Sequence, residues 1–164
     1  MIISLENKHT LQIDEFKFRC CIGKNGSTRK KNEGDKKTPK GTFEIENLYF
    51  RKDRKKKPST QLRCIEIKKN LGWCDDIRFP KKYNKPVKIE KKIKHEKLRR
   101  KDNKYDFLIP IKYNFKAPII NLGSCIFIHL TKNYNPTAGC IALREKDFLI
   151  MLKLIKKNSK IKIF

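Results

Sequence analysis

Alternating apolar and polar residues near the start of the chain predict short β-strands. We expect a hairpin made by Met1–Leu5 and Thr10–Ile13 around the turn Glu6-Asn7-Lys8. A third strand follows over Phe16–Ile22. The apolar residues recur at every second position here, so one face of each strand is predicted to be buried.

The middle of the chain is less regular. A polar loop over Gly23–Gly41 carries four glycines and one proline, and Thr42–Phe50 then returns to residues typical of strands. Arg51–Pro58 reads as a charged surface loop before a strand at Leu62–Ile67. Residues 72–102 predict an irregular excursion with room for one short helix; so long a loop is usually functional or disordered.

The last third contains better-defined elements. Tyr105–Tyr113 and Cys125–Leu130 predict buried strands, and Lys160–Phe164 predicts a closing strand. Arg144–Lys157 predicts an amphipathic helix, because its apolar residues fall at helical spacing: Phe148, Met151, Leu152 and Ile155. A chain of 164 residues has room for one domain, so we expect a single, mainly β domain over residues 1–164.

Composition excludes several classes of protein. With 38% hydrophobic residues the chain is too apolar for a disordered basic tail. Its longest apolar run, Phe148–Leu152, is far shorter than the roughly 20 residues of a transmembrane helix, so no membrane span is expected. The N-terminal MIISLENKHT has no basic segment leading into an apolar stretch, so no signal peptide is predicted.

The formal net charge is +25, from 42 Lys and Arg against 17 Asp and Glu. Lysine supplies 33 of the 42 and arginine, the better reader of bases, is scarce, which favours a solvated surface over nucleic-acid recognition. We therefore expect no nucleic-acid partner. An anionic cell-wall polymer or phospholipid remains compatible with the charge.

The six cysteines show no C-x-x-C spacing, and only three histidines are available as co-ligands. We expect mostly buried free thiols, no metal site and no cofactor.

One stretch carries candidate chemistry. The strand-like Gly123–His129 ends on a histidine, and Asn135–Leu143 then delivers a Gly-Cys pair. A cysteine needs a base or imidazolium partner to form its thiolate, and a histidine on a neighbouring element, here His129, can provide one for Cys140. Gly139 allows close approach of a substrate carbonyl, and the amides of Gly139 and Cys140 are candidate oxyanion donors.

Each catalytic candidate has a structural alternative. Cys140 on its own could be a buried structural thiol. His129 shares a strand face with Cys125 and Phe127, which is also the pattern of a packed core histidine.

Five motif blocks follow one another along the chain. They are E-G-D-x-x-T-P-x-G-x-F at Glu33–Phe43 after Ile22–Gly26, G-W-x-D within Gly72–Asp76, Y-N-x-x-V at Tyr83–Val87, E-x-L-x-R-x-D-x-x-Y-D at Glu96–Asp106, and G-S-x-I-F-x-H…P-T-A-G-C-x-A-L within Gly123–Leu143. In these blocks the chain, from about Arg19 to Phe164, resembles the L,D-transpeptidase (YkuD-like) catalytic domain family.

The resemblance implies a β-sandwich of mixed sheets with one C-terminal helix, and a cysteine acyltransferase acting on peptidoglycan stem peptides. In the family the thiolate attacks a stem tetrapeptide after diaminopimelate, releases D-alanine and passes the acyl group to an amine. Carried over, Cys140 is the nucleophile and His129 accepts and then donates the proton. The family implies the periplasm or cell envelope as the location.

Two alternatives remain open beside transpeptidation. An L,D-carboxypeptidase would hydrolyse the same thioester, and a non-catalytic basic module would bind cell wall or nucleic acid on the same scaffold. The closing motif also departs from the common family pattern: Ala138 replaces a second histidine, Ala142 replaces Asn or Arg, and only seven residues separate His129 from Thr137.

Four further residues are substrate-binding candidates: Arg100, Thr137, Trp73 and Asp76. Arg100 could grip a carboxylate with its planar fork, or pair with Glu96. Core packing and loop capping are the alternatives for Trp73 and Asp76.

Overall fold

The computed structural model describes all 164 residues and is mainly β, with 36% strand and 6% helix. The helix, α1, spans Glu145–Leu154. The strands are β1 (Ile2–Asn7), β2 (Thr10–Ile13), β3 (Phe16–Cys21), β4 (Ser27–Thr28), β5 (Thr38–Pro39), β6 (Gly41–Glu44), β7 (Leu48–Phe50), β8 (Cys64–Glu66), β9 (Leu71–Cys74), β10 (Pro86–Lys88), β11 (His95–Lys97), β12 (Phe107–Pro110), β13 (Phe127–Leu130), β14 (Ile141–Leu143) and β15 (Lys160–Ile163).

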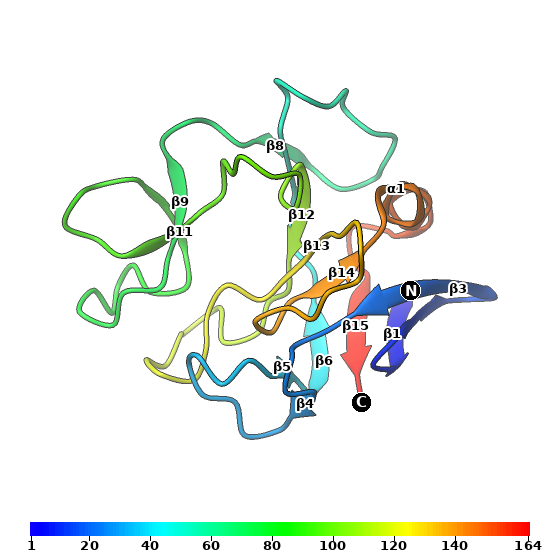
Figure 1. Cartoon of the computed structure of the whole chain (residues 1–164), viewed down its shortest axis with the longest axis horizontal. Coiled ribbons are helices and arrows are strands. Elements are labelled where there is room, and N and C mark those ends of the chain that lie inside the picture. Colours follow the sequence, from blue (N-terminus) through cyan, green and yellow to red (C-terminus); the bar gives the residue numbers. More distant parts are fainter.

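Ten strands form one long sheet in the order β6-β15-β1-β2-β3-β14-β13-β12-β7-β8. The sheet is mixed, since β1–β15, β13–β14 and β7–β8 are parallel pairs whereas the other neighbours are antiparallel. It curls into a half-barrel, and a smaller sheet of β10, β9 and β11 lies to one side of it (Figure 1). The predicted mainly β fold with mixed sheets and one C-terminal helix is confirmed.

Strands β1 and β15, toward one end of the long sheet, bury alternate residues, as their sequence pattern predicts. In β1 the buried side chains are Ile3 and Leu5, and in β15 they are Ile161 and Ile163. The central strands β12, β13 and β14 are buried at every position, because structure covers both of their faces. The candidate histidine thus belongs to the most protected part of the sheet.

Helix α1 covers part of the main core. Phe148, Met151 and Leu152 are buried, and the ring of Phe148 stacks on that of Phe107 with 6.0 Å between centroids. The helix ends at Leu154, three residues before the predicted end, because Ile155 adopts an extended conformation and its N–H bonds to the carbonyl of Met151. No helix in the structure has the length and apolarity needed to cross a membrane.

The segment 72–102 contains no helix, so the short helix allowed for it is wrong. It forms most of the three-stranded sheet β10-β9-β11 instead. Asn84 joins this sheet to the rest of the molecule: its Oδ1 accepts the indole N–H of Trp73 at 2.9 Å, and its Nδ2 donates to the carbonyls of Tyr113 and Asn114. Such tertiary contacts hold the excursion beside the long sheet.

Candidate functional site

The parallel pair β13–β14 sets the position of the candidate nucleophile and base. His129 lies opposite Ala142 in the register, and Cys140 is the residue directly before β14. The N–H of Phe127 donates to Sγ of Cys140 at 3.4 Å. Because alternate residues of paired strands share a face, His129 and Cys140 emerge on the same side of the sheet.

Both side chains line one cleft of about 540 Å³. Arg100 and Thr137 line it too, so four of the residues singled out in the sequence lie around one space. Tyr105 forms part of the same wall, and its ring meets the imidazole of His129 edge-on at 5.2 Å. This cleft is the candidate active site.

The turn before Cys140 is fastened to the glycine-rich entry of the chain. Thr38, fully buried in β5, donates its hydroxyl to the carbonyl of Gly139 at 2.9 Å and accepts the N–H of Gly23 at 3.0 Å. Backbone bonds from Thr137 N to Ile22 O and from Lys24 N to Thr137 O hold the same two segments together. The main chain leading to Cys140 is therefore held at several points.

Gly139 can adopt this turn because it has no side chain. Its φ is +142°, and a Cβ there would lie 2.9 Å from the carbonyl oxygen of Lys37. Its N–H already donates to Oγ1 of Thr137, whose hydroxyl in turn donates to the carbonyl of Cys140 at 2.6 Å. The Gly139 amide is thus engaged by Thr137, and Thr137 holds the turn with its polar group.

The N–H of Cys140 makes no hydrogen bond within the chain. Of the two amides considered from the sequence, that of Cys140 is the one free to face a developing oxyanion.

His129 carries its proton on Nδ1, which donates to the carbonyl of Leu130 at 2.8 Å. That bond leaves the lone pair on Nε2 as the basic site. Burial lowers the pKa of His129 to about 4, and the nearby positive charges of Lys104 and Arg100 lower it further. The hydrogen bond to Leu130 acts in the opposite direction. The imidazole is therefore neutral at physiological pH and able to accept a proton.

Cys140 is also neutral at rest. Burial raises the pKa of its thiol to about 12, and the Phe127 N–H opposes this only in part. Its Sγ donates to the carbonyl of Cys125 at 3.2 Å. The thiol must therefore lose its proton during the reaction itself and does not rest as a thiolate–imidazolium pair.

Arg100 lines the cleft with its guanidinium already paired. Nε and Nη2 form a two-point contact with the carboxylate of Asp102 at 2.9 and 2.7 Å, and Glu96 lies 3.4 Å from Nη1. The guanidinium also lies 5.1 Å from the ring centroid of Tyr105. A substrate carboxylate would have to compete with Asp102 for this fork.

Trp73 and Asp76 do not line the cleft. Trp73 is 1% exposed and packs edge-on against Phe127 at 5.2 Å, so it supports the strand that carries His129. Asp76 accepts the backbone N–H groups of Arg78 and Lys94 and pairs with the Arg78 side chain at 2.7 Å. We assign neither residue a contact with substrate, because packing and loop capping account for both.

Several cleft residues were not assigned to the site from the sequence, and four charged ones among them are Lys31, Glu33, Asp75 and Glu96. All but Lys31 belong to the quoted motif blocks, so the motifs already contained the three acidic residues. The spacing alone did not show which of these acidic residues line the cleft. Glu33 accepts hydrogen bonds from the hydroxyls of Tyr83 and Ser124. Asp75 has a buried Oδ1 with no hydrogen-bond partner, and Lys94 lies 3.4 Å from its Oδ2.

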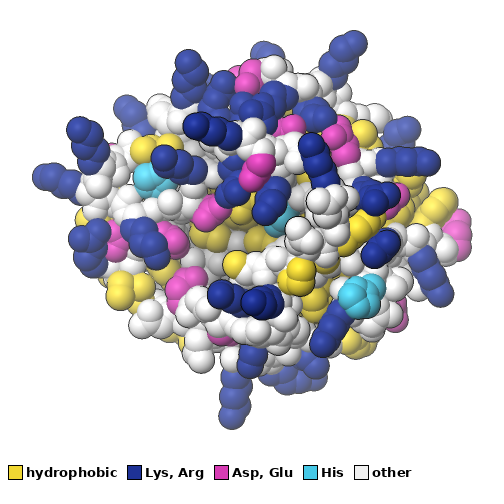
Figure 2. Space-filling view, in the orientation of Figure 1, with side chains coloured by type: hydrophobic (Ala, Val, Ile, Leu, Met, Phe, Trp, Pro, Cys, Tyr) yellow, Lys and Arg dark blue, Asp and Glu magenta, His cyan; other side chains and the backbone are white.

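The charge of the cleft differs from that of the whole chain. Its lining holds four acidic and four basic side chains, apart from His129: Glu33, Asp75, Glu96, Asp102, Lys31, Arg100, Lys104 and Lys132. Figure 2 shows Lys and Arg over much of one face, with several acidic side chains and a histidine near its hollowed centre. A groove for a polyanion would carry an excess of positive charge, so the cleft suits a ligand of mixed charge.

The six cysteines are free thiols, four of them buried and two, Cys64 and Cys125, half-buried. No group of three or more His, Cys, Asp or Glu side chains is arranged to hold a metal ion.

A family model described as the L,D-transpeptidase catalytic domain matches residues 2–163. No curated protein and no solved structure matches the chain significantly.

Replacing the Thr38 hydroxyl should loosen the Cys140 turn. Thr38→Val keeps the shape but leaves the Gly23 N–H and the Gly139 carbonyl without their partner, so we expect the free energy of unfolding to fall by about 2–4 kcal/mol. Urea unfolding measures this loss. Thr38→Ser, which keeps the hydroxyl, should lose only about 1 kcal/mol; equal losses in the two variants would show that the hydrogen bonds contribute little.

Burial of His129 should make stability fall in mild acid. The folded pKa lies near 4 against an ordinary value of 6.5, so between these pH values the unfolded chain binds a proton that the folded chain does not. The free energy of unfolding should therefore fall by up to about 3 kcal/mol as the pH drops from 6.5 through 4. His129→Gln has no imidazole to protonate. Urea titrations should therefore show that the free energy of unfolding of wild type exceeds that of the variant by an amount that shrinks as the pH falls. A constant difference would mean that His129 protonates normally in the fold.

Proposed function

Because this chain belongs to the L,D-transpeptidase catalytic domain family, we propose that it is a peptidoglycan L,D-transpeptidase whose nucleophile is Cys140. One observation carries the assignment of residues: Cys140 and His129 project from the same side of two paired parallel strands into one cleft. The enzyme acts as a single catalytic domain over residues 1–164.

In the first half-reaction, Nε2 of His129 removes the thiol proton while Sγ of Cys140 attacks the carbonyl carbon of diaminopimelate, in its peptide bond to the D-alanine of a stem tetrapeptide. The C–N bond to D-alanine breaks, and the leaving amine takes the proton from the imidazolium. A thioester on Cys140 remains. The low pKa of His129 helps the second proton transfer, because a buried imidazolium gives up its proton readily.

In the second half-reaction, the amine of an acceptor stem attacks the thioester and loses a proton to His129. An amide forms, the C–S bond breaks, and the proton returns to the thiolate. The free N–H of Cys140 stabilises the oxyanion of both tetrahedral intermediates. Substrate in the cleft displaces water, which strengthens that interaction.

Asp75 recognises an ammonium group of the stem peptide. Asp75 lines the cleft, and its buried Oδ1 has no hydrogen-bond partner, an arrangement that costs free energy until a donor arrives. The nearby Lys94 is 71% exposed and so is only a weak competitor for this carboxylate. Diaminopimelate carries the ammonium that such a carboxylate would bind.

Hydrolysis of the same thioester is the second candidate activity. Ala138 and Ala142 both line the cleft where the common family pattern has larger polar residues, so neither side chain offers a polar group to position an amine acceptor. The balanced charge of the cleft disfavours the third alternative, a basic binding module that uses this cleft.

The nucleophile is tested by intact-protein mass spectrometry after mixing with disaccharide-tetrapeptide. Wild type should gain the mass of the acyl group and release D-alanine, whereas Cys140→Ala should do neither. His129→Gln should slow acylation by about 10²–10⁴-fold while keeping the thiol. Cys125→Ala is the matched control and should still acylate. An adduct on Cys140→Ala would refute the assignment of the nucleophile. Adding an amine acceptor separates transfer from hydrolysis, because only transfer joins the acceptor to the acyl group.

Asp75 is tested by kinetics on two substrates. Asp75→Asn keeps the shape but removes the charge, so KM for the tetrapeptide should rise about tenfold or more with a smaller change in kcat. The same tetrapeptide with its side-chain amine acetylated should bind wild type and variant equally. A variant that discriminates between the two substrates as well as wild type does would rule out ammonium recognition by Asp75.

A further inference from the structure

A second cavity lies apart from the thiol cleft, under the loop that joins β7 to β8. It measures about 640 Å³, and five of its lining residues are cationic against one acidic residue, Glu66. We call it the basic pocket; its cations are Lys52, Arg54, Lys55, Lys56 and Lys57. This is a local concentration of charge, unlike the balanced cleft.

The loop over the basic pocket is held in place by its own ion pairs. Arg54 pairs with Asp106 at 3.1 Å and Lys55 with Glu145 at 2.6 Å, which ties the loop to the residue before β12 and to the first turn of α1. Arg54 also donates to the carbonyls of Lys101 and Asp102. These contacts neutralise two of the five cations and fix the loop.

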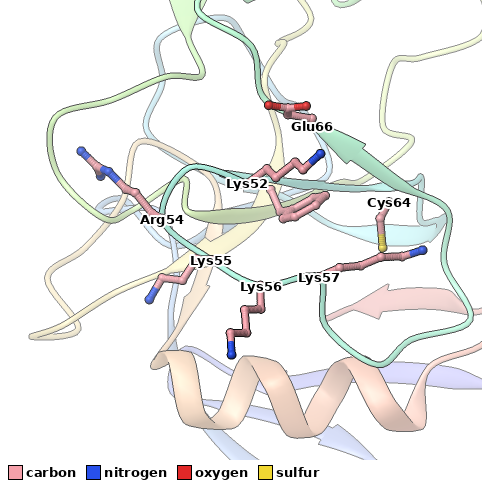
Figure 3. A pocket seen from close by; sticks show the side chains of 8 residues that line it. Lys52, Arg54, Lys55, Lys56, Lys57, Cys64 and Glu66 are labelled. Carbon is pink, nitrogen blue, oxygen red and sulfur yellow. The ribbon is translucent and has the colours of Figure 1, made fainter.

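The other three cations, Lys52, Lys56 and Lys57, take part in no ion pair. All three are exposed, so their charges are available to an anion from solution. Figure 3 shows the lysine side chains leaving the loop in different directions and not meeting at one point. A single phosphate cannot contact all of them, whereas a flexible chain with repeated negative charges can.

We propose that the basic pocket binds a linear phosphodiester polymer. Phe50, the aromatic residue in its lining, is 5% exposed and offers no platform for stacking a base, which disfavours single-stranded nucleic acid. The lysine side chains leave the loop in different directions, so a flat lipid surface would not meet all of them at once. A polymer of small polar units joined by phosphates needs no aromatic platform, and its repeated charges can reach lysines that point in different directions.

The loop over the basic pocket is bonded to a segment that borders the thiol cleft. Arg51 and Arg54, from the loop, donate to the carbonyls of residues 100–102, and the side chains of Arg100 and Asp102 line the cleft. A polymer held in the basic pocket would therefore lie beside the cleft without entering it. Binding at this site is independent of thiol chemistry.

The test measures binding of short-chain linear polyphosphate and of a glycerol-phosphate oligomer by isothermal titration calorimetry at several salt concentrations. Wild type should bind both. The variant Lys52→Gln/Lys56→Gln/Lys57→Gln should bind about tenfold more weakly, with a salt dependence reduced by about two to three counterions. The matched control, Lys81→Gln/Lys91→Gln/Lys92→Gln, removes the same charge elsewhere on the surface and should bind as wild type does.

Three results would overturn the proposal: equal weakening in both triple variants, which indicates diffuse charge; preference for phosphatidylglycerol vesicles; or tighter binding of a single-stranded oligonucleotide of equal charge. Acylation by soluble disaccharide-tetrapeptide should be the same in all three proteins. If the wild-type protein is not acylated at all, the thiol mechanism is contradicted. The result of the binding experiment stands independently of that outcome.

Discussion

The candidate site depends on one buried hydroxyl group. Thr38 bridges the N–H of Gly23 and the carbonyl of Gly139, and so connects the glycine-rich entry of the chain to the turn that presents Cys140. The two segments lie far apart in the sequence, since Gly139 comes 101 positions after Thr38. Because Gly139 adopts a φ that disfavours other residues, this turn needs support from outside itself. The parallel pairing of β13 and β14 then brings the imidazole to the same cleft.

Burial determines the resting state of the proposed chemistry. Both His129 and Cys140 lie in a desolvated wall, which lowers the pKa of the imidazole and raises that of the thiol. Each group is neutral in the free protein, and charge develops only when a proton moves between them. A thiol of this kind reacts slowly with stray electrophiles, since the thiolate is the reactive form. The hydrogen bond to Leu130 selects the histidine tautomer and so leaves one nitrogen for the reaction.

The high net charge is unevenly distributed. The cleft carries equal numbers of acidic and basic residues, with an unpartnered carboxylate oxygen on Asp75, while the loop between β7 and β8 collects cations around a separate cavity. The net charge of +25 therefore does not indicate the local charge of either the cleft or the basic pocket. The first environment suits a peptide with ammonium and carboxylate groups, and the second suits repeated phosphates. The arginines of the loop bond to the backbone that forms the cleft wall, which places the two environments on either side of one segment.

The sequence by itself determined the mainly β fold, the C-terminal helix and the family, because strand alternation, helical spacing and ordered motifs are local signals. It also singled out Cys140 and His129 as the candidate pair. Only the tertiary structure decided which side chains around them share the cleft. Trp73 packs on Phe127 and Asp76 accepts loop N–H groups, both outside the cleft lining, whereas Asp75, next to Asp76, lines the wall. Segment 72–102 became a small sheet through pairing and through Asn84, which a local pattern does not encode. The orientation, the burial and the hydrogen-bond partners of a side chain depend on contacts between segments that are distant in the sequence. A local sequence pattern therefore does not specify them.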